Sequence, residues 1–536
     1  MENKNRFYFI QSLFIFVALA LGVLVGTLIM PNNKITQIVA PAHNYNGNKV
    51  DAIIDYAEQN YVDSVDREKM ISDAINGMLQ HLDPHSSYIS REEFLEMSEE
   101  MMGNFHGIGI QFNIFSDTIT VVNTISGGPS EKLGIMAGDR IVIVDGENVA
   151  GVEISDRDVI KKLKGPKETK VKVEIKRSGV SQLIPFEIVR DVIPLYSVDV
   201  AFMANPQTAY VKISQFSATT AREFEAAVSK MKNRGAKNLI IDLRGNSGGF
   251  LDAAVHICEM IMPKERMIVY TEGRMKNREE YKTYRNGKFS NMKLAVLMDD
   301  WSASASEILA GAVQDNDLGF VIGRRSFGKG LVQEQIELRD GSAVRITVAR
   351  YYTPSGRCIQ RQYSGSVEDY YSELIKRFDS GEMENVDSLK IQDTATYYTL
   401  SGRKVYGGGG IIPDYFIPLE KNIDKAYFNV MFNMGLINRF SFQYVDENRR
   451  KLKAKYDAQS FIDNYVVSDK LLEKLFDYSH ENGHKRVGNV SQELKDEFKL
   501  TLKSFIGRNL YGEEAFYPIY LQSDKVFLKA IDIFKQ

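Results

Sequence analysis

Two consecutive stretches of the chain repeat the order strand, polar loop and helix, and this repeat constrains the fold more than any other feature. Residues 237–244 read as an apolar strand and lead into the glycine-rich residues 245–249, after which apolar residues recur at helical spacing. Residues 293–323 add a second strand, a second helix and a third strand. Such alternation predicts a layered α/β core whose functional site lies at the strand ends. We place this core at residues 195–418, with a charged helical insertion at 364–394.

An apolar run near the N-terminus stands apart from this core. Between residues 13 and 30 nothing more polar than a threonine interrupts it, and this length is sufficient for a helix that crosses a bilayer. Two cations precede the run, which favours a cytoplasmic start and an external body. We therefore predict a transmembrane signal anchor at residues 1–30 and a polar tether at 31–48. The alternative is a signal peptide that is cleaved near residues 40–42.

Residues 49–97 have helical spacing that breaks at a Leu-Asp-Pro-His turn, residues 82–85, and they predict a small N-terminal helical region. His81 and His85 flank this break and suggest a metal site as an alternative. However, the proline between them disrupts the helical geometry that would bring an i, i+4 pair together.

Charge and cysteine content exclude several classes of function. The 67 basic and 70 acidic residues nearly cancel, and no long basic run provides a local field, so we expect no binding of nucleic acid. The two cysteines, Cys258 and Cys358, can form neither a disulfide framework nor a four-ligand zinc cluster. We expect no metal and no other cofactor.

Residues 98–190 change to short β patterns with turn signals between them and two short helical patterns. The second helical pattern, residues 155–163, starts with Ser155 as a plausible N-cap. The order of these motifs resembles a PDZ domain of the bacterial type. That resemblance implies that backbone N–H groups bind the terminal carboxylate of a peptide, which adds as a strand to an exposed sheet edge beside an apolar helix face. The implied peptide-binding residues are Gly107, Ile108, Gly109 and Ile110 in the loop and Val159, Ile160 and Leu163 on the helix.

Two kinds of chemistry compete for the site of the core. Gly323 to Lys329 comes close to a phosphate-binding P-loop, but Gly330 stands where magnesium needs Ser or Thr. Residues 331–338 also alternate like a strand, whereas a P-loop opens a helix. Nucleophilic catalysis is the other interpretation. Ser304 lies at a predicted helix N-terminus, where the helix dipole and free N–H groups can stabilise an oxyanion.

A nucleophilic serine needs a base, and the chain offers few. No histidine lies between residues 257 and 479, which argues against a Ser/His/Asp triad. Lys329 lies among glycines and apolar residues, where loss of solvation can lower its pKa enough to make it a base. Both residues also have a purely structural interpretation. Ser304 and Glu307 have the spacing of a capping box, and a lone loop lysine is commonly solvated.

Several motifs in a fixed order resemble the C-terminal processing peptidases, also called tail-specific proteases. The matching residues are 82–88, 302–308, 314–316, 327–330, 333, 351–357 and 407–414. The resemblance covers roughly residues 45–418. It implies that Ser304 is the nucleophile, that Lys329 is the general base and that Gln333 orients the lysine.

The same resemblance implies an oxyanion hole built from backbone N–H groups of Ala305, Gly248 and Gly249. Gly245 and Ser247 depart from the Asn and Pro that are more common in the family, which puts the stiffness of this loop in doubt.

Residues 420–536 form a helical extension rich in Lys, Glu and aromatic residues, in which no motif is readable. A packing lid, an oligomerisation arm and a docking surface remain open for it. We predict a multidomain α/β and β protein in which a layered α/β protease core follows a PDZ domain, with an N-terminal transmembrane helix and a helical C-terminal extension.

The predicted function is a serine endopeptidase that recognises C-terminal tails of proteins and cleaves by a Ser-Lys dyad. The alternative is a non-catalytic PDZ scaffold that binds protein C-termini. We expect a single-pass protein of a bacterial inner membrane with its catalytic body in the periplasm; release into the periplasm after signal cleavage is the rival location. Its expected partners are proteins with accessible apolar tails and the membrane, and homo-oligomers stay open.

Overall fold

The computed structural model describes residues 17, 18, 21, 49–363, 366–389, 395–419, 425–484 and 490–535. The chain divides into two compact units, residues 1–77 and residues 78–536. Almost all of the predicted anchor and tether lies outside the described residues, so both remain predictions. Among the helices that are described, none combines the length and the apolar character needed to cross a membrane.

The first unit contains helix α2 (Lys49–Asn60) and most of α3 (Arg67–Leu79). Arg67 ties these helices together, because its guanidinium donates to the carboxylates of Asp55 (2.7 Å) and Glu58 (2.9 Å). In the second unit the helical pattern breaks at residues 80–86, as the Leu-Asp-Pro-His turn predicts. Strand β1 (Ser87–Ile89) follows, and Ser90 caps helix α4 (Arg91–Met102) by accepting from the amide of Glu93.

The PDZ region is an antiparallel sheet closed by two short helices. Its strands pair in the order β3-β4-β5-β7-β8 with β6 beside β5, and they are β3 (Ile110–Ile114), β4 (Ile119–Thr124), β5 (Arg140–Val144), β6 (Glu147–Asn148), β7 (Lys170–Lys176) and β8 (Ile184–Val189). The helices are α5 (Pro129–Leu133) and α6 (Asp156–Leu163), the latter capped by Ser155 as predicted. Alternate residues of β7 are buried, as expected for a sheet with one covered face. Strand β3 pairs only with β4 and is therefore an edge of this sheet.

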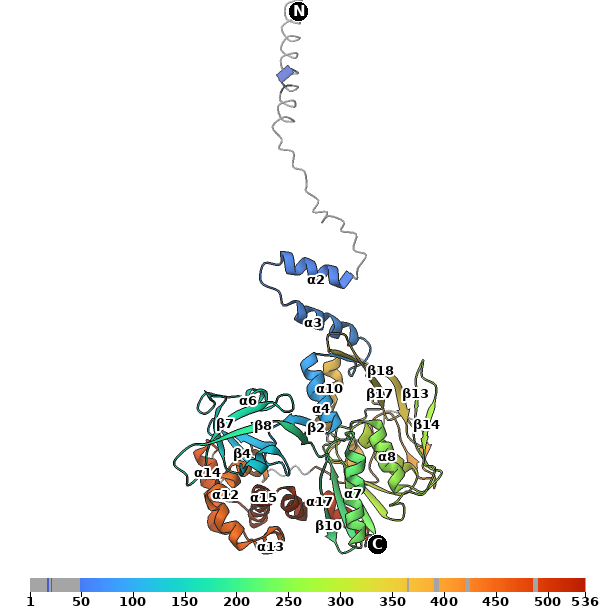
Figure 1. Ribbon diagram of the computed structural model, residues 1–536. Helices are drawn as coiled ribbons and strands as arrows, with labels where there is room; N and C mark the ends of the chain where they lie inside the picture. The colour runs from blue at the N-terminus through green and yellow to red at the C-terminus, as the bar shows by residue number, and fades with distance from the viewer. Residues whose placement is uncertain are drawn as a thin grey trace, which may run out of the picture. The chain divides into compact units, whose positions relative to one another are not determined.

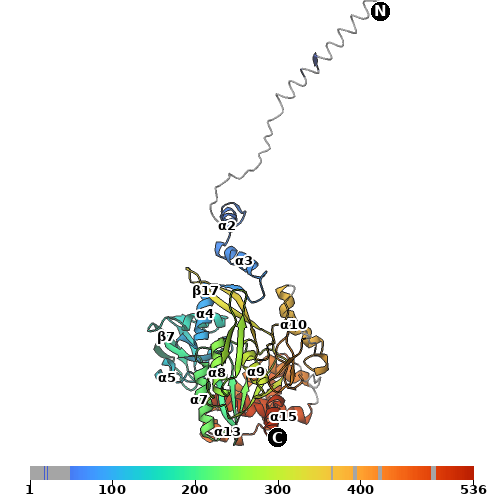
Figure 2. The same cartoon turned by 90° about the vertical axis from the view of Figure 1, so that its right-hand side faces the viewer.

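The core is built on a six-stranded sheet in the order β10-β11-β12-β15-β16-β21. These strands are β10 (Val198–Asn205), β11 (Thr208–Ile213), β12 (Asn238–Asp242), β15 (Lys293–Met298), β16 (Gly319–Gly323) and β21 (Tyr415–Phe416). From β11 onwards they run parallel. Every residue of β12 is buried, because parallel strands are covered on both faces. Helices α7 (Thr220–Asn233), α8 (Leu251–Ile261) and α9 (Ala305–Asp315) pack together on one face (Figure 2).

A second, antiparallel sheet carries the strand that follows the loop of Lys329. It contains β1, β13 (Met267–Glu272), β14 (Glu279–Lys282), β17 (Leu331–Glu337) and β18 (Ala343–Tyr352), and β18 pairs with β1, β13 and β17. The segment after Gly330 is therefore a strand, which excludes a P-loop. The predicted insertion contains α10 (Val367–Asp379) and the 3-10 turn η1 (Val386–Ser388); β19 (Tyr397–Tyr398) and β20 (Lys404–Val405) follow it. Strand β2 (Asn104–Gly107) pairs with β9 (Asp191–Pro194) at the entry and exit of the PDZ region.

The C-terminal extension is helical, as predicted, and contacts both the PDZ region and the core. Its elements are α11 (Ala426–Asn433), α12 (Leu436–Lys455), α13 (Ala458–Asn464), α14 (Asp469–Glu481), α15 (Gln492–Tyr511), α16 (Glu513–Tyr520), η3 (Leu521–Ser523) and α17 (Lys525–Ile533). Helix α12 lies beside the strands of the PDZ region (Figure 1). On α12, Phe442 stacks on Phe115 of the PDZ region with ring centroids 4.5 Å apart. Ahead of α17, Asp524 accepts from Arg244 of the core at 2.7 Å. Helix α17 also packs on the face of the core sheet opposite α7, α8 and α9.

Candidate active site

Ser304 lies between the carboxyl end of β15 and the start of α9, where the backbone is strained. Its φ of 55° and ψ of −114° are uncommon for any residue other than glycine. The buried Tyr351 hydroxyl donates to the Ser304 carbonyl at 3.2 Å and helps to hold this conformation. Ser304 and Glu307 have the reciprocal arrangement of a capping box, and the Glu307 amide donates to the Ser304 carbonyl oxygen (2.9 Å).

Glu307 joins the two loops that carry the predicted nucleophile and base. Its side chain is fully buried, and its Oε2 accepts from the amides of Ser304 (2.8 Å) and Lys329 (2.9 Å). Its Oε1 accepts from the Gly328 amide (2.7 Å) and the Ser326 hydroxyl. Burial raises the pKa of this carboxyl, while these four donors favour its charged form. One carboxylate thus fixes the backbone at both reactive residues.

Lys329 lies in the loop between β16 and β17, and its ammonium group donates to Gln333 Oε1 at 2.9 Å. Burial, with a smaller effect of the nearby positive charge of Arg345, lowers the pKa of Lys329 to about 8. A lysine with such a pKa is partly neutral near neutral pH and can accept a proton. The expectation of a desolvated lysine agrees with this environment.

Gln333 connects the lysine to the segment ahead of β1. Its Nε2 donates to the carbonyl oxygen of His85 at 2.7 Å, so both ends of its amide group are held. The His85 ring reaches Tyr370 on α10, with 2.8 Å between Nε2 and the tyrosine oxygen. The side chain of Asp83 accepts from the amides of His85 (2.8 Å) and Ser86 (2.9 Å). This turn therefore supports Gln333. Across the described part of the chain, no cluster of His, Cys, Asp and Glu could hold a metal ion.

The glycine loop after β12 lies against the start of α9. A Cβ added to Gly248 would come within 2.7 Å of the Ser304 Cβ, and one added to Gly249 within 2.1 Å of the Phe216 carbonyl oxygen, so neither position has room for a side chain. Buried Asn246 stiffens the loop: its Nδ2 donates to the Ile213 carbonyl (3.0 Å) and its Oδ1 accepts from the Gly248 amide (2.8 Å).

The bond to Asn246 bears on the predicted oxyanion hole. The Gly248 N–H already donates to Asn246 Oδ1. To donate to an oxyanion, it would have to break this hydrogen bond or share its proton between two acceptors. Ala305 is the first residue of α9, where backbone N–H groups point away from the helix. Ala305 and Gly249 therefore remain the more direct candidates.

The structure distributes the predicted peptide-binding residues of the PDZ region unequally. Val159 and Leu163 lie in the hydrophobic core of the domain, together with Ile108. Ile160 is 38% exposed and differs from its two helix neighbours in this respect. Of the three α6 residues predicted for the groove wall, Val159 and Leu163 are therefore buried and Ile160 is exposed. Gly107 ends β2, and Ile110 begins the edge strand β3.

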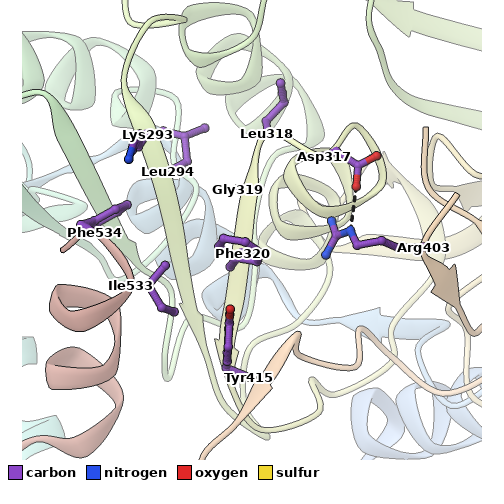
Figure 3. Close-up of a pocket in the computed structure, with 10 residues that line it drawn as sticks. All are labelled: Lys293, Leu294, Asp317, Leu318, Gly319, Phe320, Arg403, Tyr415, Ile533 and Phe534. Carbon is purple, nitrogen blue, oxygen red and sulfur yellow. Dashed lines mark hydrogen bonds and ion pairs between the residues drawn. The ribbon is translucent and has the colours of Figure 1, made fainter. Parts of the chain in front are cut away.

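A cavity of about 510 Å³ lies away from these residues (Figure 3). It opens at the amino ends of β15 and β16, near Lys293 and Gly319, whereas Ser304 follows the carboxyl end of β15. Because β15 and β16 are parallel, their amino ends lie on the same side of the sheet. The cavity at these amino ends is therefore at the opposite end of the strands from Ser304. Arg403 is held in the cavity wall by Asp317 at 2.7 Å. The chemistry of Ser304 does not use this cavity.

Sequence reasoning missed three supports of the site. It treated Glu307 only as the capping partner of Ser304. The spacing of these two residues was the available signal that Glu307 lies close to the site. It assigned no role to Asn246 or to the insertion that provides Tyr370. Their partners lie far away in the sequence, so no local pattern could reveal them.

Known proteins resemble this chain along most of its length. Residues 207–371 match the model of peptidase family S41, residues 107–187 the PDZ domain and residues 30–93 the activating protease CtpB N-terminal domain. Residues 427–512 match a family of unknown function.

Two relatives match this chain over most of their own length. A carboxy-terminal-processing protease of Bartonella bacilliformis is 37% identical over 313 residues, 58% of this chain and 71% of the relative. The carboxy-terminal processing protease CtpA of Bacillus subtilis is 32% identical over 394 residues, 71% of this chain and 82% of the relative. Among solved structures, the photosystem II D1 C-terminal processing protease is 25% identical and covers 70% of this chain and 88% of its own, with a TM-score of 0.34 that is too low to support an argument. On the sequence identity of these relatives, the chain belongs to the carboxy-terminal processing proteases of peptidase family S41, and it is a serine-type endopeptidase that carries a PDZ domain.

Proposed function

We propose that Ser304 and Lys329 form the catalytic dyad of this peptidase, with Gln333 as the residue that orients the lysine. The observation that carries the proposal is the shared carboxylate of Glu307, which binds the backbone amides of both reactive residues. The hydrogen bond from Lys329 to Gln333 and the lowered pKa of the lysine supply the second half of the argument. A serine at a helix N-terminus and a partly neutral lysine are the two components that such a dyad needs.

In the proposed reaction the neutral amine of Lys329 takes the hydroxyl proton of Ser304 while the serine oxygen attacks the carbonyl carbon of the scissile peptide bond. The negative charge that develops on the carbonyl oxygen is stabilised by the backbone N–H groups of Ala305, at the start of α9, and of Gly249, in the glycine loop after β12. The lysine ammonium then gives its proton to the leaving amine, and an acyl-enzyme remains. Water, deprotonated by Lys329, attacks the acyl-enzyme; the ester bond to Ser304 breaks, the lysine ammonium returns the proton to the serine oxygen, and the second product leaves.

Two substitutions test the dyad. Ser304→Ala removes the nucleophile, and Lys329→Arg keeps a positive charge that cannot be given up at usable pH, so both variants should lose hydrolysis of an unstructured reporter protein. Thermal unfolding checks that each variant is folded. Turnover by folded Ser304→Ala would refute the nucleophile, and turnover by Lys329→Arg would refute the base.

We further propose that the PDZ region selects substrates by their C-terminal tail. The edge position of β3 and the loop at residues 107–110 support this, because an extended peptide can pair with an open edge strand and place its carboxylate on loop N–H groups. Charge-assisted bonds of this kind contribute about 1.5–3 kcal/mol each. Amidation of the substrate's C-terminus should therefore raise KM by about tenfold or more. Equal KM values for the amidated and free-acid forms would contradict tail selection.

The location is proposed on sequence grounds. The cations at positions 4 and 6 and the apolar run that ends at residue 30 support an anchor in a bacterial inner membrane, with the catalytic body in the periplasm. Release into the periplasm after cleavage is the rival. Carbonate extraction of membranes and N-terminal sequencing of the mature protein separate the two: an anchored protein stays in the membrane pellet with its first residues intact.

A further inference from the structure

The insertion that interrupts the core packs directly on the loop that carries Lys329. From α10, Arg377 donates to the carbonyl oxygens of Arg325 (2.7 Å) and Ser326 (3.1 Å). Arg325 in turn donates to Glu382, a buried residue that follows α10. These bonds tie the catalytic loop to α10, which lies at the edge of the core in Figure 2.

Tyr370 is the residue of α10 that extends this contact to the turn ahead of β1. Its side chain is only 4% exposed, and its hydroxyl lies 2.8 Å from His85 Nε2. The guanidinium of Arg361 lies between the rings of Tyr370 (3.8 Å) and Phe327 (3.9 Å), and Phe327 precedes Lys329 by two residues. Tyr370 thus touches both segments that hold the lysine in place.

The bond between Tyr370 and His85 has a defined direction. Gln360 Nε2 approaches the tyrosine oxygen as a donor at 3.5 Å, which leaves the hydroxyl proton for a different acceptor. Burial and the charge of Lys329 lower the pKa of His85 to about 3, so the imidazole is neutral and has one acceptor nitrogen. We therefore assign the tyrosine as the donor to Nε2 and the ring proton to Nδ1.

From His85 the contact continues through the backbone to the lysine. The peptide group between His85 and Ser86 donates its N–H to Asp83 and accepts from Gln333 through its carbonyl oxygen. Tyr370 holds the His85 ring, while Asp83 and Gln333 hold the N–H and the carbonyl oxygen of this peptide group. His85 is therefore fixed through both its side chain and its backbone. The remaining step is the bond from Lys329 to Gln333.

We propose that Tyr370, provided by the insertion, is a positioning residue for Lys329 that acts through His85 and Gln333. The proposal rests on the role of Lys329 as the base. Tyr370 fixes where the lysine amine points and excludes water from it.

The test must consider every charge that faces the lysine. Arg345 on β18 lowers its pKa, whereas Asp83 in the turn and Glu307 on α9 raise it. Arg361 and Arg345 also face His85. Replacing Tyr370 by phenylalanine changes none of these charges, so a shift in the lysine's titration reports solvation and geometry alone.

The experiment measures kcat and KM for the wild type and Tyr370→Phe over a range of pH. Without the tyrosine bond the imidazole is free to turn away and water gains access to the amine, so the rising limb of kcat/KM should move from about pH 8 toward higher pH. A shift of about half a pH unit or more is expected, with kcat lower by about tenfold and KM within about twofold. Tyr371→Phe is the matched control, because the neighbouring hydroxyl makes only a long bond to the Pro84 carbonyl (3.4 Å) and is largely exposed.

A double-mutant cycle decides whether the effect passes through His85. His85→Phe should produce the same shift of the limb, and adding Tyr370→Phe to it should produce no further shift. If Tyr370→Phe does not fold, His85→Phe breaks the same bond from the other side and takes its place. An unchanged limb and kcat in the folded variant, even with a lower Tm, would overturn the positioning role. A wild-type profile without a limb near pH 8, or an active Lys329→Arg, would instead refute Lys329 as the base.

Discussion

The carboxylate of Glu307 offers the sharpest test of how the site is held together, through the substitution Glu307→Gln. Glutamine has the same shape but one carbonyl oxygen and one NH₂ group. If the NH₂ group takes the position of Oε2, the amides of Ser304 and Lys329 both lose their acceptor. If it takes the position of Oε1, the Gly328 amide loses its acceptor, and the Ser326 hydroxyl can accept from the NH₂ group once its own proton turns to another acceptor.

The second orientation is the less costly one, and it sets the expected magnitude. One buried N–H without a partner costs about 1–3 kcal/mol in the free energy of unfolding. The substitution also removes a buried charge, and this gain offsets part of the cost. Burial disfavours the charged form of Glu307, as the raised pKa of its carboxyl indicates. The effect on activity should exceed the effect on stability, because the two loops are no longer held by one charged group. We expect kcat to fall by about 10²-fold, the loss that a displacement of about 1 Å can cause.

Asp315→Asn is the matched control at the other end of α9. Asp315 is also buried and accepts from Arg357 at 2.8 Å, so its loss should destabilise the fold by about 3–5 kcal/mol. It touches neither catalytic loop, and kcat of the folded variant should stay within about twofold. The assay is hydrolysis of an unstructured reporter beside urea unfolding of each variant. A Glu307→Gln variant with wild-type kcat, or an equal loss of kcat in Asp315→Asn, would refute the reasoning.

Two further predictions concern stability. The pKa of Lys329 is about 8 in the folded chain against 10.5 for a free lysine, so between these values the unfolded chain binds more protons and the stability of the wild type rises with pH. Lys329→Met should therefore be more stable at pH 7 by up to about 3 kcal/mol, from 10.5 − 8 = 2.5 units at 1.36 kcal/mol each, and urea unfolding should show this advantage vanish as pH approaches 10.5. At the contact between the C-terminal extension and the PDZ region, Phe442 is 3% exposed, and Phe442→Ala should cost about 3–5 kcal/mol. Asp446→Asn, which breaks a partly exposed ion pair with Arg140, should cost about 1 kcal/mol or less; a larger cost for Asp446→Asn than for Phe442→Ala would contradict burial as the source of this contact.

Much of the local structure could be predicted from patterns a few residues long. The cap at Ser155, the strand at 293–298 and the turn at 82–85 each depend on near neighbours, and the structure has all three. Lys329 and Gln333 are four residues apart and hydrogen-bonded, although Lys329 precedes β17 and the pairing of β17 with β18 has an irregular register at this point. Such signals persist because hydrogen bonds and side-chain directions within an element are set locally.

The assembly of the site was decided by the tertiary structure. The bond from Gln333 to His85 spans 248 residues and that from His85 to Tyr370 spans 285, so neither leaves a local pattern. The tertiary structure also decided the exposure of the apolar residues on α6. Their spacing identified the helix face that contacts apolar neighbours, but it did not show which of these residues reach the surface. Ile160 is exposed while Val159 is buried, because the sheet behind the helix covers only part of that face. Sequence alone therefore determined the elements, and the family resemblance pointed to the residues that we propose as reactive. Their mutual positions depended on packing between distant segments, because only the folded chain brings a buried carboxylate such as Glu307 within reach of four donors.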